Sequence, residues 1–410
     1  MKLHELESAL ENGEFVYYYQ PKISLVTGRI SGAEALIRWI RPNGEIVLPN
    51  RFIPLAESTG FVTEISLTMF PKLVTDALII NDVNAKLITA FNLSAKDFEN
   101  RHLLHAIQDA SGRIDLARLG AELTEASVIS LDNSRAIDNL RELAESGIRL
   151  AMDDFGTGYS SIDTLSRLPF DIIKLDQGLI SRMPDSERSA TIVLASIRMA
   201  HQLGMEIVAE GIETASAYDF LLHAGCTEVQ GFWIARPMPL DDYLAFIRKD
   251  QIWTGLPTGL IHMAILDHVQ WRQQLISRVT SLAFNGKIDE ATISASNVEV
   301  DHHQCKLGRW YYGVGQAFRG HPVFDRLEEP HRLLHQAGFD LLESARQGMS
   351  RSELTRQMRM LTHQSSRIIE LLQELESEAM IDLSFKNTRG SPESQESGFS
   401  RASLSIFTTS

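Results

Sequence analysis

Polar side chains stand at or near the downstream ends of successive apolar runs in the first 230 residues. The runs from Lys86 to Asn92 and from Ile148 to Asp153 are two examples. Each is typical of a buried parallel strand whose last residue emerges at the rim of a sheet. If such strands close into a barrel, their ends meet on one face, where β/α-barrel enzymes place their active sites. The residues are Glu34, Asn92, Glu122, Asp153, Asp154, Lys174 and Glu210.

The chemistry of this set indicates divalent metal ions. Carboxylate and carboxamide oxygens are hard ligands that suit Mg²⁺ or Mn²⁺, and a lysine with a further carboxylate can orient and deprotonate a water molecule. A buried cluster of five carboxylates with one lysine is very costly without cations. The residues therefore predict a metal site before any family is considered.

Several short blocks in this region occur in the order seen in EAL-domain cyclic-di-GMP phosphodiesterases. The resemblance covers roughly residues 1–250, which we expect to form one domain, and implies a modified TIM-like (β/α)8 barrel with one antiparallel strand. The blocks are Tyr19-Gln20-Pro21, Glu34-Ala35-Leu36-Ile37-Arg38-Trp39, Phe52-Ile53-Pro54-Leu55-Ala56-Glu57, Asn92-Leu93-Ser94, Glu122-Leu123-Thr124-Glu125, Asp153-Asp154-Phe155-Gly156-Thr157-Gly158, Lys174-Leu175-Asp176, Ala209-Glu210-Gly211 and Val229-Gln230-Gly231-Phe232.

The resemblance implies hydrolysis of cyclic-di-GMP to linear diguanylate with two Mg²⁺ or Mn²⁺ ions per active site. In this role Lys174 orients the attacking water and Glu210 accepts its proton. The implied metal ligands are Glu34, Asn92, Glu122, Asp153 and Asp154. The implied substrate contacts are Gln20, Leu36, Arg38 and Gln230. A loop that links the metal site to a dimer interface is implied for Phe155, Gly156, Thr157 and Gly158, with Glu125 as its anchor.

The strands that must position these residues can be read from the apolar runs. The first two are joined through a turn at 27–29, too short for a crossover helix, so we expect them to be antiparallel. The later strands alternate with helical stretches. The eight predicted strands are Phe15–Gln20, Ile30–Trp39, Leu87–Leu93, Gly120–Thr124, Ile148–Asp153, Asp171–Leu175, Glu206–Ala209 and Glu228–Gly231.

The pattern changes beyond Ile247. A Gly- and Pro-containing linker is expected at 251–259, followed by an all-α four-helix bundle at 260–380 and a serine-rich, disordered tail at 381–410. Helical apolar spacing predicts helices over Leu260–Phe284, Leu327–Gln347 and Ser352–Glu378.

The predicted bundle carries a second set of metal ligands. His331 and His335 are four residues apart and share a helix face, and Cys305 and His268 could complete a tetrahedral Zn²⁺ site. From the residues alone, His262, His302 and His303 are alternative ligands, whereas His321, before Pro322, reads as a helix-entry residue. The blocks Asp267-His268-Val269-Gln270-Trp271, Cys305-Lys306-Leu307-Gly308-Arg309-Trp310 and His331–His335 together resemble the chemoreceptor zinc-binding (CZB) domain. That resemblance assigns one zinc ion to His268, Cys305, His331 and His335.

Composition sets limits on function. The net charge of −14 argues against binding to polymeric nucleic acid, so a dianionic dinucleotide needs local positive charge from metals, Arg38 and Lys174. Two cysteines, Cys226 and Cys305, cannot make a disulfide framework, and no signal segment or membrane-spanning run is visible. We expect a cytoplasmic protein that does not insert into membranes and, by family habit, a homodimer.

Alternatives remain at this point. The same pocket could serve a catalytically silent cyclic-di-GMP receptor, although the residues that silent members lose are all present. Zinc could inhibit or activate, and Cys305 could instead report oxidants. Glu57 is expected to cap or pair structurally, and Cys226 to behave as a small hydrophobe.

Overall fold

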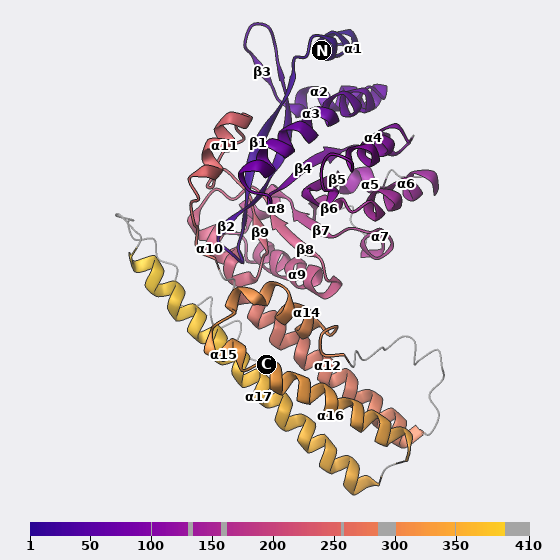
Figure 1. The fold of residues 1–410 in the computed structure, drawn as a ribbon, viewed down its shortest axis with the longest axis vertical. Helices are drawn as coiled ribbons and strands as arrows, with labels where there is room; N and C mark the ends of the chain where they lie inside the picture. Colours follow the sequence, from indigo (N-terminus) through magenta and orange to yellow (C-terminus); the bar gives the residue numbers. More distant parts are fainter. Residues whose placement is uncertain are drawn as a thin grey trace.

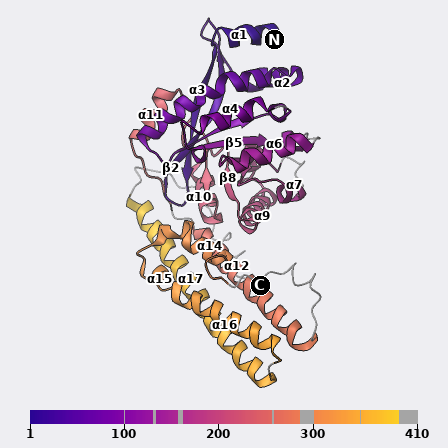
Figure 2. The same cartoon turned by 45° about the vertical axis from the view of Figure 1, so that its right-hand side comes forward.

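The structure is a computed structural model that describes residues 1–99, 101–129, 134–156, 162–255, 258–285, 301–348 and 350–389. It has a strand-rich N-terminal part and an all-helical C-terminal part beneath it (Figure 1). Turning the molecule leaves the two parts distinct, with the long helices extending away from the barrel (Figure 2).

Eight strands close into a barrel, as the resemblance implied. Strand β1 pairs antiparallel with both of its neighbours, β2 and β9, and the remaining barrel pairs are parallel. A short strand β3 (Ile46–Val47) pairs antiparallel with the end of β2, outside the closed barrel, and was not predicted. The barrel strands are β1 (Phe15–Ser24), β2 (Arg29–Ile40), β4 (Ile88–Leu93), β5 (Leu119–Thr124), β6 (Arg149–Phe155), β7 (Ile172–Leu175), β8 (Glu206–Ala209) and β9 (Glu228–Val229).

The antiparallel start follows from the turn between β1 and β2. Gly28 has a φ of +66°, which a side chain would strain, and a Cβ there would lie 2.2 Å from the Trp253 carbonyl oxygen. The connection from Ser24 to Arg29 is also too short for a crossover helix, so the chain returns directly into the antiparallel strand. In the resulting register Gln20 lies opposite Glu34, so the first two site residues meet across neighbouring strands.

Helices surround the barrel and bury its apolar exterior. Leucine, isoleucine and alanine side chains from the strands and helices form one continuous core, and a smaller cluster lies under the N-terminal helices. The elements are α1 (Leu3–Glu11), α2 (Pro49–Thr59), α3 (Val62–Val83), η1 (Ala95–Phe98), α4 (His102–Ala110), η2 (Leu116–Arg118), α5 (Glu125–Ile129), α6 (Ser134–Glu145), α7 (Ile162–Arg167), α8 (Gln177–Arg182), α9 (Glu187–Leu203), α10 (Ala215–Ala224) and α11 (Leu240–Arg248).

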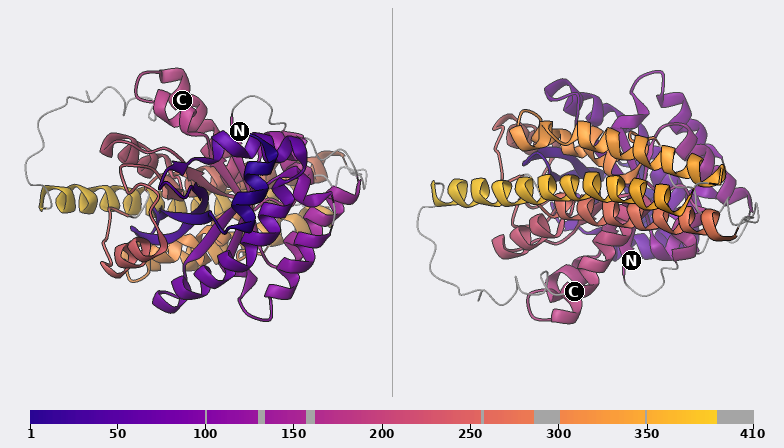
Figure 3. Two further views of the ribbon diagram at one scale, coloured as in Figure 1. Left: turned by 90° about the horizontal axis from the view of Figure 1, so that it is seen from above. Right: turned by 90° about the horizontal axis from the view of Figure 1, so that it is seen from below.

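The C-terminal part confirms the predicted helical region. Three long helices, α12 (Thr258–Asn285), α16 (Glu328–Arg346) and α17 (Arg351–Arg389), lie side by side, as the view from below also shows (Figure 3). The shorter α14 (Lys306–Tyr312), η3 (Val314–Phe318) and α15 (Pro322–Asp325) lie at the end near the barrel. Helix α17 continues to Arg389, past the expected start of the tail at 381, whereas 390–410 lie outside the described residues.

The helical part docks on the base of the barrel, where the strands begin. The start of α12 packs against the turn between α10 and β9, and a Cβ on Gly259 would lie 2.2 Å from the His223 carbonyl oxygen. His201, at the end of α9, bonds through Nε2 to the Gly225 carbonyl oxygen at 2.8 Å. Val26, from the β1–β2 turn, packs against the core of the helical part.

No helix in the described ranges is both long and apolar enough to cross a membrane.

Candidate active site and zinc centre

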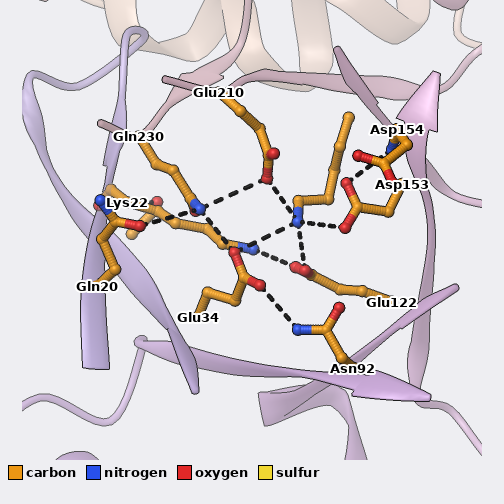
Figure 4. Close-up of polar contacts among 11 residues, drawn as sticks. Gln20, Lys22, Glu34, Asn92, Glu122, Asp153, Asp154, Glu210 and Gln230 are labelled. Carbon is orange, nitrogen blue, oxygen red and sulfur yellow. Dashed lines mark hydrogen bonds and ion pairs between the residues drawn. The ribbon is translucent and has the colours of Figure 1, made fainter. Parts of the chain in front are cut away.

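Lys174 lies at the centre of the polar set inside the barrel. Its Nζ is 2.6 Å from Glu210 Oε1, 3.2 Å from Asp153 Oδ2 and 3.4 Å from Glu34 Oε2, and it also pairs closely with Glu122. The ammonium group is fully buried. Figure 4 shows the carboxylates of Glu34, Glu122, Asp153 and Glu210 pointing inward from different strand ends. These four residues therefore lie together around Lys174.

Lys22 is a second buried ammonium that sequence reasoning missed. Its Nζ is 2.6 Å from Glu122 Oε1, so Glu122 lies between two lysines. The available signal was its position two residues after Gln20, because alternate residues of a strand share a face. Pro21 suggested that the strand ends there, but β1 continues to Ser24.

Amide side chains orient Glu34 within this cluster. Asn92 donates through Nδ2 to Glu34 Oε1 at 2.8 Å, and Gln230 donates through Nε2 to Glu34 Oε2 at 2.6 Å. The Gln230 Nε2 also lies 3.5 Å from Gln20 Oε1, and Gln20 donates to the Ala235 carbonyl oxygen at 3.2 Å. Gln20 and Gln230, the substrate contacts implied by the resemblance, are thus buried beside the carboxylates.

Burial and the close approach of several charged groups shift the pKa values in this cluster. Burial raises the pKa of Glu34, but the charges of Lys174 and Lys22 and the two amide donors outweigh it and lower this pKa to about 2. Burial, opposed by Lys174, raises the pKa of Glu210 well above its ordinary value. Burial would lower the pKa of Lys174, yet the surrounding carboxylates raise it well above normal.

Asp154 and Arg38 lie at the edge of the cluster. Asp154 adopts a φ of +56°, a strained backbone conformation, and donates its backbone N–H to Asp153 Oδ1 at 2.8 Å. Arg38 donates to the Ile37 carbonyl oxygen at 2.9 Å and lies over the Tyr18 ring. It shares its strand face with Glu34 and with the half-buried Leu36, because the three alternate along β2.

The loop after β6 is only partly described. Phe155 is buried and Gly156 has a φ of +99°, whereas Thr157 and Gly158 lie outside the described residues. Glu125 is 2% exposed at the start of α5, close in sequence to Glu122.

The end of β4 is held by a capping network. Asp97 accepts from the Ser94 backbone N–H at 2.9 Å, and Ser94 caps η1. The Ser94 hydroxyl also donates to Glu57 Oε1 at 2.9 Å. Glu57 thus makes the structural contact expected of it, and the network fixes the chain just after Asn92.

A second buried cluster lies in the helical part. One ligand atom from each of Cys305, His331 and His335 lies within 4.8 Å of the others, and Cys305 Sγ is 3.2 Å from His331 Nε2. Cys305 begins α14, where its sulfur accepts from the Gly308 N–H at 3.2 Å. Burial, followed by the nearby imidazoles, lowers the pKa of His331 to about 2, so this ring is neutral at pH 7. A neutral imidazole can donate its lone pair to a metal.

His268 lines the same cavity, of about 330 Å³, as these three residues. It is not part of the tight cluster, and its Nε2 lies 2.9 Å from the Ser365 hydroxyl. Burial and the charge of Arg272 lower its pKa to about 4. The structure therefore brings three of the assigned ligands into contact range and places the fourth at the cavity wall.

His262, His321 and Cys226 lie outside this cluster. His262 lies 3.7 Å from Glu376, outside the cavity lining, and His321 caps α15 just before Pro322, as predicted. Cys226 is fully buried in the barrel core, and burial raises its pKa to about 12.

Two family profiles match the chain. The EAL domain matches residues 3–237, and the chemoreceptor zinc-binding domain matches residues 268–342. The first match covers more than half of the chain, so this protein belongs to the EAL-domain family, with a chemoreceptor zinc-binding domain in its C-terminal part.

Curated relatives match the barrel. The cyclic di-GMP phosphodiesterase PA2567 of Pseudomonas aeruginosa is 40% identical over 248 residues, which cover 59% of this chain and 42% of PA2567. The bifunctional diguanylate cyclase/cyclic di-GMP phosphodiesterase MucR of the same organism is 36% identical over 248 residues, covering 60% of this chain and 36% of MucR. This chain thus spans less than half the length of either relative.

Solved structures match the same region. The MucR phosphodiesterase in complex with c-di-GMP superposes with a TM-score of 0.55 at 36% identity, covering 59% of this chain and 98% of that one. The EAL enzyme Bd1971, in its cAMP- and cyclic-di-GMP-bound form, gives a TM-score of 0.57 at 27% identity, covering 60% and 67%.

Proposed function

We propose that this protein hydrolyses cyclic-di-GMP to linear diguanylate at the mouth of the barrel. The observation that carries the proposal is the convergence of four carboxylates on Lys174, with two amides that donate to one of them, Glu34. Relatives and solved neighbours whose names specify cyclic di-GMP support the choice of substrate.

The residues fit a site for divalent cations. Four carboxylates, those of Glu34, Glu122, Asp153 and Glu210, surround the Lys174 ammonium, and Lys22 pairs with Glu122 as a second ammonium group. The excess negative charge and the hard oxygen donors favour Mg²⁺ or Mn²⁺. Glu34, Asn92, Glu122, Asp153 and Asp154 would hold two such ions, which stabilise developing charge in an in-line phosphodiester displacement.

The remaining residues position the reactants. Glu210 accepts the proton of the attacking water, and Lys174 orients that water while holding the carboxylates in place. Arg38 contacts the substrate phosphate, with Leu36 beside the ligand on the same strand face. Gln20 and Gln230 keep Glu34 oriented and add polar contacts to the ligand. The product leaves as a linear dinucleotide with a 5′-phosphate.

We further propose that the C-terminal domain binds one Zn²⁺ and that this ion modulates turnover. Cys305, His331 and His335 would hold it, and His268 would join them by releasing Ser365. The docking of α12 on the barrel base offers a physical route between the two sites. By analogy with its modules, we propose that the protein works as a cytoplasmic homodimer.

Glu210→Gln tests catalysis most directly. It should lower kcat by about 10²–10⁴-fold with Mg²⁺ or Mn²⁺ while cyclic-di-GMP still binds, because the amide cannot accept a proton. Glu213→Gln is a matched control at an exposed position of the same loop. Wild-type turnover in Glu210→Gln would exclude this base, and wild-type protein that binds but never cleaves the dinucleotide would indicate a silent receptor.

A chelator experiment tests the zinc domain. Hydrolysis by the full-length protein should change when zinc is removed, and Cys305→Ala should abolish this response. Cys226→Ala, which alters the other buried cysteine, should retain it. Identical rates in Cys305→Ala and wild type, with and without zinc, would leave the helices with a structural role only.

A further inference from the structure

A second group of possible metal ligands lies on the surface just before α14. One ligand atom from each of Asp301, His302 and His303 lies within 4.8 Å of the others. Their side chains are 51%, 20% and 53% exposed, in contrast to the buried cluster of Cys305, His331 and His335. The motif blocks that carry the resemblance do not include these three residues, although His302 and His303 were alternative ligands from the residues alone.

Local contacts fix the positions of the three side chains. Asp301 Oδ1 accepts from the His303 N–H at 2.9 Å and lies 3.0 Å from His303 Nδ1 and 3.8 Å from His302 Nδ1. Both imidazoles therefore converge on one carboxylate oxygen. The Tyr312 ring stacks on His303, with centroids 4.6 Å apart.

The helix behind the group is shaped to receive it. A Cβ on Gly308 would lie 1.8 Å from the His302 carbonyl oxygen, so the loop packs against α14 closely enough to exclude any side chain there. The group is consequently held against a helix instead of projecting from a free loop.

His302 faces the buried cluster as well as the surface group. Its ring centroid is 5.9 Å from that of His331 and 6.4 Å from that of His335. Its carbonyl oxygen is 3.6 Å from Cys305 Sγ. The His302 imidazole thus belongs to the surface group and also lies next to the buried one.

We propose that Asp301, His302 and His303 form a second, exchangeable Zn²⁺ site that loads the buried site. Two imidazoles and a carboxylate are ligands that zinc accepts, and three protein ligands leave a position open to water. The surface ion is therefore held more weakly than one enclosed by thiolate and imidazoles. The loading step rests on the proposed buried zinc site, whereas binding at the surface does not.

Transfer is a ligand exchange without redox change. The ion leaves the Asp301 carboxylate and the two surface imidazoles and binds the Cys305 thiolate, His331 and His335. The proton of the Cys305 thiol is released to solvent, because only the thiolate ligates zinc. His302 is the ligand that can turn from one group to the other.

Equilibrium dialysis of the full-length protein against Zn²⁺ tests the surface site. Because the barrel carboxylates can also take up Zn²⁺, the surface site is counted as a difference between proteins. Wild type should bind one weakly held ion more than His303→Ala, and the tightly held ion should be the same in both proteins. His363→Ala, at an exposed position on α17, is the matched control and should keep both. Equal numbers of bound ions in wild type and in the double variant Asp301→Asn with His303→Ala would overturn the proposal.

Stopped-flow mixing with Co²⁺ tests loading, because a thiolate-to-cobalt charge-transfer band reports only the ion at Cys305. In His303→Ala this band should reach its wild-type amplitude but grow about tenfold more slowly, since the surface site no longer raises the local metal concentration. Equal rates would refute loading. If wild type shows no such band, the buried site fails, while dialysis still decides whether the surface site exists.

Discussion

Asp97 offers a quantitative test of how the metal-site strand is held. Its side chain is 3% exposed, and its Oδ2 accepts from the Ser94 N–H and the Ser66 hydroxyl. Burial outweighs these donors and raises the pKa of Asp97 from 3.8 to about 6. A shift of this size corresponds to about 3 kcal/mol of differential stability between the two protonation states.

The sign follows from proton linkage. Because the folded carboxyl has the higher pKa, the folded state holds a proton that the unfolded state has released between about pH 4 and pH 6. The free energy of unfolding therefore falls as pH rises through this window. Between about pH 5 and pH 7.5 the loss amounts to about 1.4 kcal/mol.

Asp97→Asn removes the titration while keeping an oxygen acceptor for Ser94. When the pH is raised over this range, the Tm of the variant minus the Tm of wild type should increase by about 3–6 °C. This figure assumes about 2–4 °C per kcal/mol for a domain of this size. Differential scanning calorimetry at the two pH values measures the change. Asp109→Asn, an exposed change on α4, is the control and should show none. If the Tm difference between Asp97→Asn and wild type is the same at both pH values, Asp97 does not titrate as described.

Three further predictions concern the metal site and the docking of the helices. Lys22→Met should destabilise the metal-free protein by about 3–5 kcal/mol, because it breaks the buried ion pair with Glu122. Mn²⁺ should then raise the Tm of this variant more than that of wild type. An equal rise would argue against compensation of the carboxylate charge by Lys22. Gly225→Ala should make the helical part more susceptible to limited proteolysis, because its Cβ would lie 2.9 Å from Gly259. Gly147→Ala, also at positive φ but with open space around it, should only lower the Tm. Equal proteolysis in both variants would contradict this docking. Ca²⁺ should support hydrolysis poorly compared with Mg²⁺, since its longer bonds misplace the water, and equal rates in an endpoint assay of linear dinucleotide would refute that reasoning.

The barrel was predictable from sequence because buried parallel strands leave an unusual signal. The apolar run that ends at Asn92 is one of several runs that end in a polar residue. The runs define the strands, and their polar ends define the rim that the strands share. The antiparallel start was predictable from the short turn at Gly28. These features depend on local sequence, so one chain suffices to find them.

Other features depend on the tertiary structure. Lys22 was missed because Pro21 normally ends a strand, yet β1 passes through it with a register shift after Lys22. Strand β3 has two residues, too few for any periodic pattern. The bond between His268 and Ser365 joins α12 to α17 across 97 residues, and no spacing rule could anticipate it.

If zinc modulates turnover as proposed, the position of the helical part decides which kinds of control are open to it. The helices dock where the strands begin, whereas the carboxylates lie toward the opposite ends of the strands. A zinc-induced movement of these helices cannot plug the catalytic mouth of its own chain as a lid would. Control within one molecule must instead distort the barrel from beneath, through the turns that precede β8 and β9, and so alter the spacing of Lys174, Glu210 and Gln230 without touching the ligand.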